Sequence, residues 1–147
     1  MSNEFDSDLR QLQSELSASR AELLGVIGSL ADSDLDRARR GGWTITRVLE
    51  HVIQSETMYM AAIAAIVGAS ASSPQGSGPP SSQAEAVQQL GSTRAALETA
   101  LNSATEENFY QLQRFGHDEY SVASVLENVA NHDREHAEQV RRTLTAS

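Results

Sequence analysis

Apolar side chains recur along most of this chain in steps of three, four or seven residues, the spacing of one face of an α-helix. Four such segments are separated by three polar breaks, and no stretch shows the strict alternation of a half-buried strand. The pattern therefore predicts four amphipathic helices and no β-sheet. Four amphipathic helices of roughly 18–26 residues in one domain are typical of a four-helix bundle.

The first two segments are the most clearly periodic. The first carries the stripe Phe5, Leu9, Leu12, Leu16, Leu23, Ile27 and Leu30. A loop is predicted over 32–42, and it closes on two glycines. The second segment starts at Thr44, whose hydroxyl is expected to cap the helix, with Trp43 and Val48 as a hydrophobic staple. Its stripe consists of Ile45, Val48, Leu49, Val52, Tyr59, Met60, Ile63 and Ile66.

The second half of the chain is less apolar. Residues 68–82 read GASASSPQGSGPPSS, which predicts a flexible, exposed connection. The third segment opens at Ser82 with the pattern of a capping box that ends on Glu85, and it should be the weakest helix. The fourth segment begins at Ser121 and carries Val122, Val125, Leu126, Val129, Val140 and Leu144. We expect residues 1–147 to form a single domain.

Composition removes several function classes. The 147 residues include 20 acidic and 11 basic side chains, a net charge of −9, which disfavours nucleic acid as a partner. Every basic residue is arginine and there is no cysteine, so Schiff-base lysine chemistry, disulfides, cysteine–zinc sites and a protein thiol nucleophile are excluded. The start MSNEFDSD lacks a basic and apolar leader pattern and favours the cytoplasm. The apolar run 58–67 is too short to cross a membrane.

Two histidines stand one helical turn apart in the fourth segment. His132 and His136 are related as i and i+4, so their side chains share a face about 5–6 Å apart at Cβ. Both lean toward the predicted bundle interior, where two imidazoles form half of a metal site. The alternative is that this spacing is polar helix surface.

A third histidine, His51, lies at the edge of the apolar stripe of the second segment. With the pair in the fourth segment it would complete a three-imidazole set that leaves coordination positions open, as catalytic sites require. The alternative is an interfacial histidine bonded to a carbonyl. His117 lies in the sequence FGHDEY outside the helical segments, and we interpret it as a solvated loop residue.

Two acidic residues fall on inward faces near these histidines. Glu56 lies almost at the centre of the second stripe, where a carboxylate is costly unless it is paired or binds a metal. Asp133 lies on the inner face of the fourth segment. Either is a candidate partner that orients a ligating histidine, or a candidate general base. The alternative for Glu56 is an ion pair with an arginine of another helix. Tyr59 and Arg47 are candidates for a pocket wall.

Two motifs together resemble the DinB/YfiT-like superfamily of metal-dependent enzymes. The first runs from Gly42–Trp43–Thr44 to His51 and Glu56, and the second is the run NHDREHAEQ at 131–139. Many members have Arg-Gly where this chain has Ala-Glu at 137–138. The resemblance implies a four-helix bundle, often dimeric, in which His51, His132 and His136 hold a divalent metal.

The resemblance also implies candidate activities. Members transfer low-molecular-weight thiols such as bacillithiol or mycothiol, and others are metal-dependent hydrolases. We therefore expect transfer of such a thiol to an electrophilic small molecule, with hydrolysis as the first alternative and a non-catalytic, metal-stabilised helical dimer as the second. Three neutral imidazoles suit several ions. We expect zinc, followed by nickel, and then iron or manganese, in a cytoplasmic homodimer.

Overall fold

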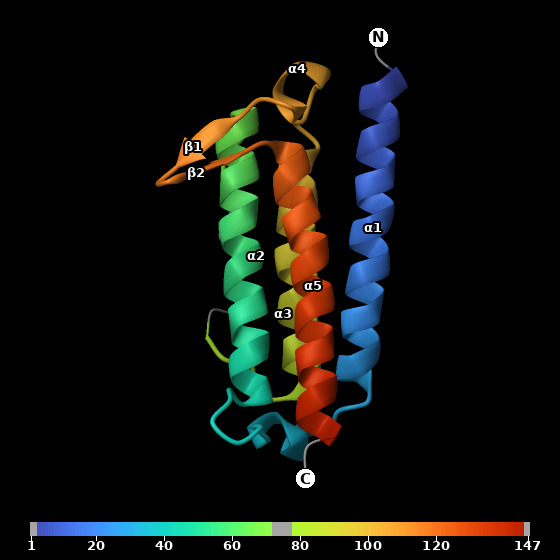
Figure 1. Ribbon diagram of the computed structural model, residues 1–147, viewed down its shortest axis with the longest axis vertical. Helices are drawn as coiled ribbons and strands as arrows, with labels where there is room; N and C mark the ends of the chain where they lie inside the picture. Colours follow the sequence, from blue (N-terminus) through green and yellow to red (C-terminus); the bar gives the residue numbers. More distant parts are fainter. Residues whose placement is uncertain (1–2, 72–77, 146–147) are drawn as a thin grey trace.

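The computed structural model describes residues 3–71 and 78–145 and confirms the four-helix bundle (Figure 1). The long helices are α1 (Asn3–Gly28), α2 (Ile45–Val67), α3 (Gln83–Leu101) and α5 (Val122–Thr145). A short 3₁₀ helix, η1 (Asp32–Asp36), follows α1, and one helical turn, α4 (Glu106–Phe109), follows α3. In the described part of the chain, no helix combines the length and the apolarity needed to cross a membrane.

Side-chain caps start the helices where the sequence places them. The Thr44 hydroxyl accepts a hydrogen bond from the Arg47 amide at 3.1 Å, and the Ser82 hydroxyl accepts one from the Glu85 amide at 3.1 Å. Both caps were predicted and are confirmed. The capping box predicted here is formed only in half. Among the described residues the Glu85 carboxylate accepts from Ser81 (2.8 Å) and Gln89 (3.2 Å), and not from the Ser82 amide. These caps satisfy backbone N–H groups that a helix start leaves without partners.

The long helices form two parallel pairs that run in opposite directions. In Figure 1, α1 and α5 run down the picture, whereas α2 and α3 run up it. The start of α3 accordingly lies at the end of α1, where the Gln83 amide donates to Asp32 and its side chain to the Ile27 carbonyl. The connection 68–82 therefore joins opposite ends of the bundle. Residues 72–77, which carry much of its predicted flexibility, lie outside the described residues.

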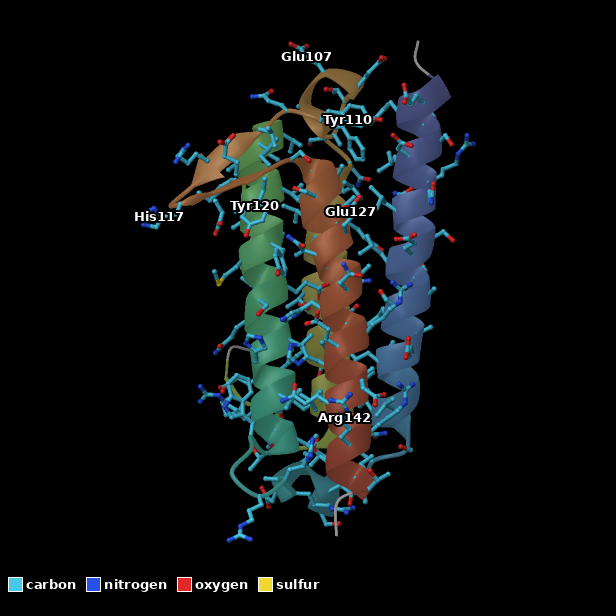
Figure 2. The ribbon with its side chains drawn as sticks, viewed as in Figure 1. Glu107, Tyr110, His117, Tyr120, Glu127 and Arg142 are labelled. Atoms are coloured by element: carbon cyan, nitrogen blue, oxygen red, sulfur yellow. The ribbon has the colours of Figure 1, made fainter. Side chains whose placement is uncertain are left out.

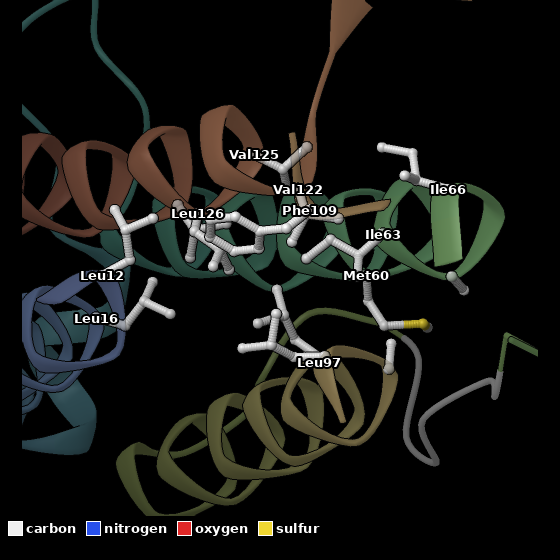
Figure 3. Close-up of a cluster of buried hydrophobic side chains, with 14 of the residues drawn as sticks. Leu12, Leu16, Met60, Ile63, Ile66, Leu97, Phe109, Val122, Val125 and Leu126 are labelled. Carbon is white, nitrogen blue, oxygen red and sulfur yellow. The ribbon is translucent and has the colours of Figure 1, made fainter. Parts of the chain in front are cut away.

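The core consists of two hydrophobic clusters stacked along the bundle axis. The upper cluster, shown in Figure 3, includes Leu12, Leu16, Met60, Ile63, Leu97, Phe109, Val122, Val125 and Leu126. The lower cluster includes Leu23, Ile27, Ile45, Val48, Leu49, Val52, Leu90, Ala137 and Val140. Along every long helix a buried polar residue falls between the two clusters, so a polar layer crosses the middle of the core.

The prediction that the chain contains no sheet is wrong at one place. Strands β1 (Gln113–Phe115) and β2 (Asp118–Tyr120) pair as an antiparallel hairpin between α4 and α5. Gly116 opens its two-residue turn at φ +67°, a left-handed conformation that glycine adopts without a side-chain clash. Strands of three residues are too short to show the alternation by which a strand is recognised in a sequence.

Candidate metal centre

The structure brings together the three histidines named from the sequence. His51 comes from α2, and His132 and His136 come from α5. The Nε2 atom of His132 lies 3.1 Å from that of His51 and 3.0 Å from that of His136. Candidate ligand atoms of all three residues lie within 4.8 Å of one another, and all three side chains are half-buried. The cluster thus has one face in the bundle and one toward solvent.

Neighbouring rings hold two of the imidazoles in place. The Trp43 ring stands edge-on to His51 at 5.3 Å between ring centroids, and the Arg47 guanidinium lies 5.0 Å from the centre of the Trp43 ring. On the other side, the Tyr59 ring stands edge-on to that of His132, with 6.1 Å between the ring centroids. Aromatic contacts of this edge-to-face kind restrict ring rotation and add packing energy.

Gln139, a residue not singled out from the sequence, fixes the tautomer of His136. The Nδ1 atom of His136 lies 2.6 Å from Oε1 of Gln139, one helical turn further along α5. An amide oxygen only accepts hydrogen bonds, so Nδ1 carries the proton and Nε2 keeps its lone pair. This lone pair points to the other two histidines, which is how proteins orient metal-ligating imidazoles. The i, i+3 spacing of His136 and Gln139 was a signal available in the sequence.

The surroundings keep two of the histidines neutral. Burial, followed by the neighbouring His136 and His51, lowers the pKa of His132 to about 4. Burial, together with His136 and Arg47, also lowers the pKa of His51 below its ordinary value. Because only a neutral imidazole offers a lone pair to a metal, both groups are in the binding form at neutral pH.

The donor set fits a divalent ion. Two nitrogens bound to one tetrahedral zinc ion lie about 3.3 Å apart, close to the 3.1 and 3.0 Å between these Nε2 atoms. Protons alone do not satisfy three converging Nε2 atoms. A neutral imidazole carries one N–H, and His132 faces two partners with the same nitrogen. An ion that accepts three lone pairs removes this conflict.

The two candidate carboxylates belong to a buried ion cluster beside the histidines. Glu56 accepts hydrogen bonds from Arg20 (2.9 Å), Arg94 (2.7 Å) and the Thr93 hydroxyl (2.6 Å). Asp133 accepts from Arg20 (3.1 Å) and Arg94 (2.8 Å). Two arginines and two carboxylates from four helices thus neutralise one another in the polar layer of the core.

This cluster changes the interpretation of both acids. In the described part of the chain, the hydrogen bonds of Glu56 and Asp133 go to Arg20, Arg94 and Thr93, and none goes to a histidine. Burial raises the pKa of Glu56, but the two guanidiniums outweigh it, so the net pKa is lowered. A carboxylate with a lowered pKa and occupied oxygens is a weak base. The alternative considered for Glu56 from the sequence, an ion pair with an arginine of another helix, is observed with both Arg20 and Arg94.

Two hollows flank the histidines. One, of about 260 Å³, lies under the hairpin and includes Tyr59 in its wall. The other, also about 260 Å³, lies at the start of α2, and Arg39, Arg40 and Gln139 are among its lining residues. His117 belongs to neither hollow. It is exposed at the tip of the hairpin in Figure 2, as the sequence predicts.

The fold and this cluster define the protein as a four-helix bundle with a candidate three-histidine metal site. The family model of the DinB superfamily matches residues 15–140. The chain therefore belongs to the DinB superfamily, and the resemblance seen in its two motifs is confirmed.

Two solved structures share the fold. The four-helix bundle protein TT2238 is 22% identical, with a TM-score of 0.70 over 90% of this chain and 96% of its own. A DinB-like protein from Bacillus cereus ATCC 10987 is 19% identical, with a TM-score of 0.69 over 95% of this chain and 89% of its own. The comparison with curated proteins gives no match. At these identities the two structures support the fold alone.

Proposed function

We propose that this protein is a metal-dependent transferase that joins a low-molecular-weight thiol to an electrophilic small molecule. The convergence of three Nε2 atoms from His51, His132 and His136 carries the proposal. These residues would hold one divalent ion, zinc first and nickel next, because neutral imidazoles suit both. A bound divalent ion lowers the pKa of a coordinating thiol and so favours the nucleophilic thiolate.

Neighbouring residues of the chain hold the three histidine rings in position. Gln139 fixes the tautomer of His136, and Trp43 and Tyr59 restrain the rings of His51 and His132. Since the sequence contains no cysteine, the sulfur nucleophile comes from a cosubstrate. In the reaction the thiol loses its proton to solvent, its sulfur bonds to an electrophilic carbon, and the leaving group departs from that carbon.

Hydrolysis is the second candidate, and the ion cluster argues against it. A hydrolase gains from a general base near the ion that removes a proton from water. The two carboxylates suited by position, Glu56 and Asp133, are instead occupied by Arg20 and Arg94. Thiol transfer has less need of such a base, because a thiol is far more acidic than water. A non-catalytic, metal-stabilised dimer is the third candidate.

The test begins with elemental analysis of the purified protein. A panel of thiols is then assayed with 1-chloro-2,4-dinitrobenzene, and thioether and chloride release are followed. We expect product that depends on both protein and thiol and that is lost in His132→Ala. Ester hydrolysis without a thiol would favour the hydrolase, and stoichiometric metal with neither activity would favour the non-catalytic dimer.

A further inference from the structure

A hollow under the β-hairpin adjoins the histidine cluster, and we call it the hairpin pocket. It measures about 260 Å³ and is formed by one side of α2, the hairpin and the first turn of α5. Its lining residues are Ser55, Met58, Tyr59, Ala62, Phe115, Tyr120 and Val125. Figure 2 shows Tyr120 at the base of the hairpin, beside α2.

The hairpin pocket and the histidines share a wall. Tyr59 lines the pocket, and its ring contacts the imidazole of His132. Ser55, another lining residue, lies one helical turn after His51 on α2, so the two share a face of that helix. The hairpin pocket therefore adjoins the histidine cluster along α2, with Tyr59 between them.

The lining selects for a neutral, apolar group. None of the seven lining residues carries a charge, although the chain as a whole has a net charge of −9. Two tyrosines and a phenylalanine offer ring faces, and Met58, 73% exposed, offers an adaptable thioether at the rim.

The size and the hydroxyl groups narrow the ligand further. A protein cavity of about 150 Å³ binds benzene, so 260 Å³ accommodates one substituted ring. Tyr59 and Tyr120, two of the lining residues, each carry a phenol hydroxyl. A protonated phenol donates a hydrogen bond to a nitro or carbonyl oxygen on such a ring.

We propose that the hairpin pocket binds the uncharged aromatic part of the electrophile and presents its reactive carbon to the histidine cluster. This inference rests on the proposed function for the identity of the reaction, but the binding of an aromatic ring is testable without turnover. Tyr59 is then the residue common to the electrophile pocket and the metal-binding cluster.

Nitrobenzene, which is neutral and has no halide leaving group, is the probe. It is titrated into the intact protein, and backbone amide shifts are recorded by NMR. We expect the shifts of Tyr59, Ala62 and Val125 to saturate with added probe. Ala62→Phe fills the pocket and should abolish these changes. The matched control is Ala61→Phe, an exposed alanine on the same helix that does not line the pocket, and it should bind like the unaltered protein.

A second variant guards against misfolding of Ala62→Phe. Met58→Glu lies at an exposed position, so it leaves the core intact, and its carboxylate at the rim should weaken binding roughly tenfold. The inference would be overturned if the unaltered protein showed no saturable shifts. It would also be overturned if Ala62→Phe and Met58→Glu both bound nitrobenzene as tightly as the unaltered protein. Saturable binding in a protein that lacks thiol transfer would instead overturn the proposed function and leave the pocket in place.

Discussion

At the scale of single residues, the three histidines differ in what fixes their rings. His136 is held by a hydrogen bond to Gln139, whereas His51 and His132 are held by contacts with the rings of Trp43 and Tyr59. A hydrogen bond selects a tautomer, and a ring contact selects only an orientation. Gln139 is therefore the residue whose loss should change metal affinity most without removing a ligand.

Gln139→Leu should weaken metal binding roughly 10- to 100-fold, because the proton on Nδ1 of His136 loses its acceptor. Competition with a chromophoric chelator measures the affinity. Gln139→Glu, which keeps an acceptor oxygen at this position, is the matched control and should bind nearly as tightly as the unaltered protein. Equal affinity in the leucine variant would mean that the Gln139 hydrogen bond does not support the site.

The lowered pKa of His132 predicts how the metal-free protein responds to acid. In the unfolded chain this imidazole binds a proton near pH 6.5, but in the folded protein it does so only near pH 4. The unfolded state therefore holds more protons between these values, and stability should fall as the pH drops from 6.5 toward 4. Urea unfolding with chelator present at pH 7 and pH 5 checks this. The difference in the free energy of unfolding between pH 7 and pH 5 should shrink in His132→Asn. An unchanged difference would mean that His132 is not the group responsible.

At the scale of elements, the polar layer ties the four long helices together. The Arg20 guanidinium also donates to the Leu90 carbonyl of α3, and the Arg94 guanidinium to the Leu16 carbonyl of α1. Arg20 of α1 thus binds the backbone of α3, and Arg94 of α3 binds the backbone of α1. Since charges in a core are tolerated only when paired, the cluster fixes which residues of the four helices lie at the same level.

Removing one acid from this layer should be costly. Glu56→Leu leaves Arg20 and Arg94 with a single carboxylate in a buried site, and we expect a loss of about 3–5 kcal/mol in the free energy of unfolding. Glu22→Gln is the control, because it breaks an exposed ion pair with Arg141 and should cost less than about 1 kcal/mol. Urea denaturation compares them. Similar small losses in both variants would show that the buried cluster contributes little to stability.

The sequence predicts those elements whose signal is local. Helix periods and the caps at Thr44 and Ser82 depend on neighbours within a few residues, and they were predicted correctly. The contact of His51 with His132 spans 81 residues. Helix faces made it one candidate among alternatives, and the family resemblance implied it. The pairing of Glu56 with Arg20 and Arg94 joins three helices, and no periodicity states which charges of different helices meet.

At the scale of the whole molecule, different elements cover the two ends of the bundle. The hairpin and α4 cover one end, while η1 and the loop before α2 cover the other (Figure 1). The histidine cluster lies between these ends on the α2–α5 side, with a hollow toward each. In the proposed reaction, substrates would approach from two directions, one apolar under the hairpin and one lined by Arg39 and Arg40.

Homodimerisation remains a prediction at this scale. The inward face of α3 carries the polar residues Gln89, Thr93 and Arg94, and Val87 on the same helix is 40% exposed, so this helix gives the bundle limited apolar cover. A second copy of the chain packed against the bundle would bury more of its apolar surface. Sedimentation equilibrium at low micromolar concentration should show a dimer, and a monomer throughout that range would contradict the prediction.

The central claim is that His51, 81 residues before His132 in the sequence, forms one metal site with His132 and His136. The most direct measurement is the zinc and nickel content of the unaltered protein and of four single variants after incubation with the ion. His51→Ala, His132→Ala and His136→Ala should each lose stoichiometric binding, because two imidazoles seldom hold a metal tightly. His117→Ala, at the exposed hairpin tip, should retain it. Equal metal in His51→Ala and the unaltered protein, or no uptake by the unaltered protein, would contradict the account.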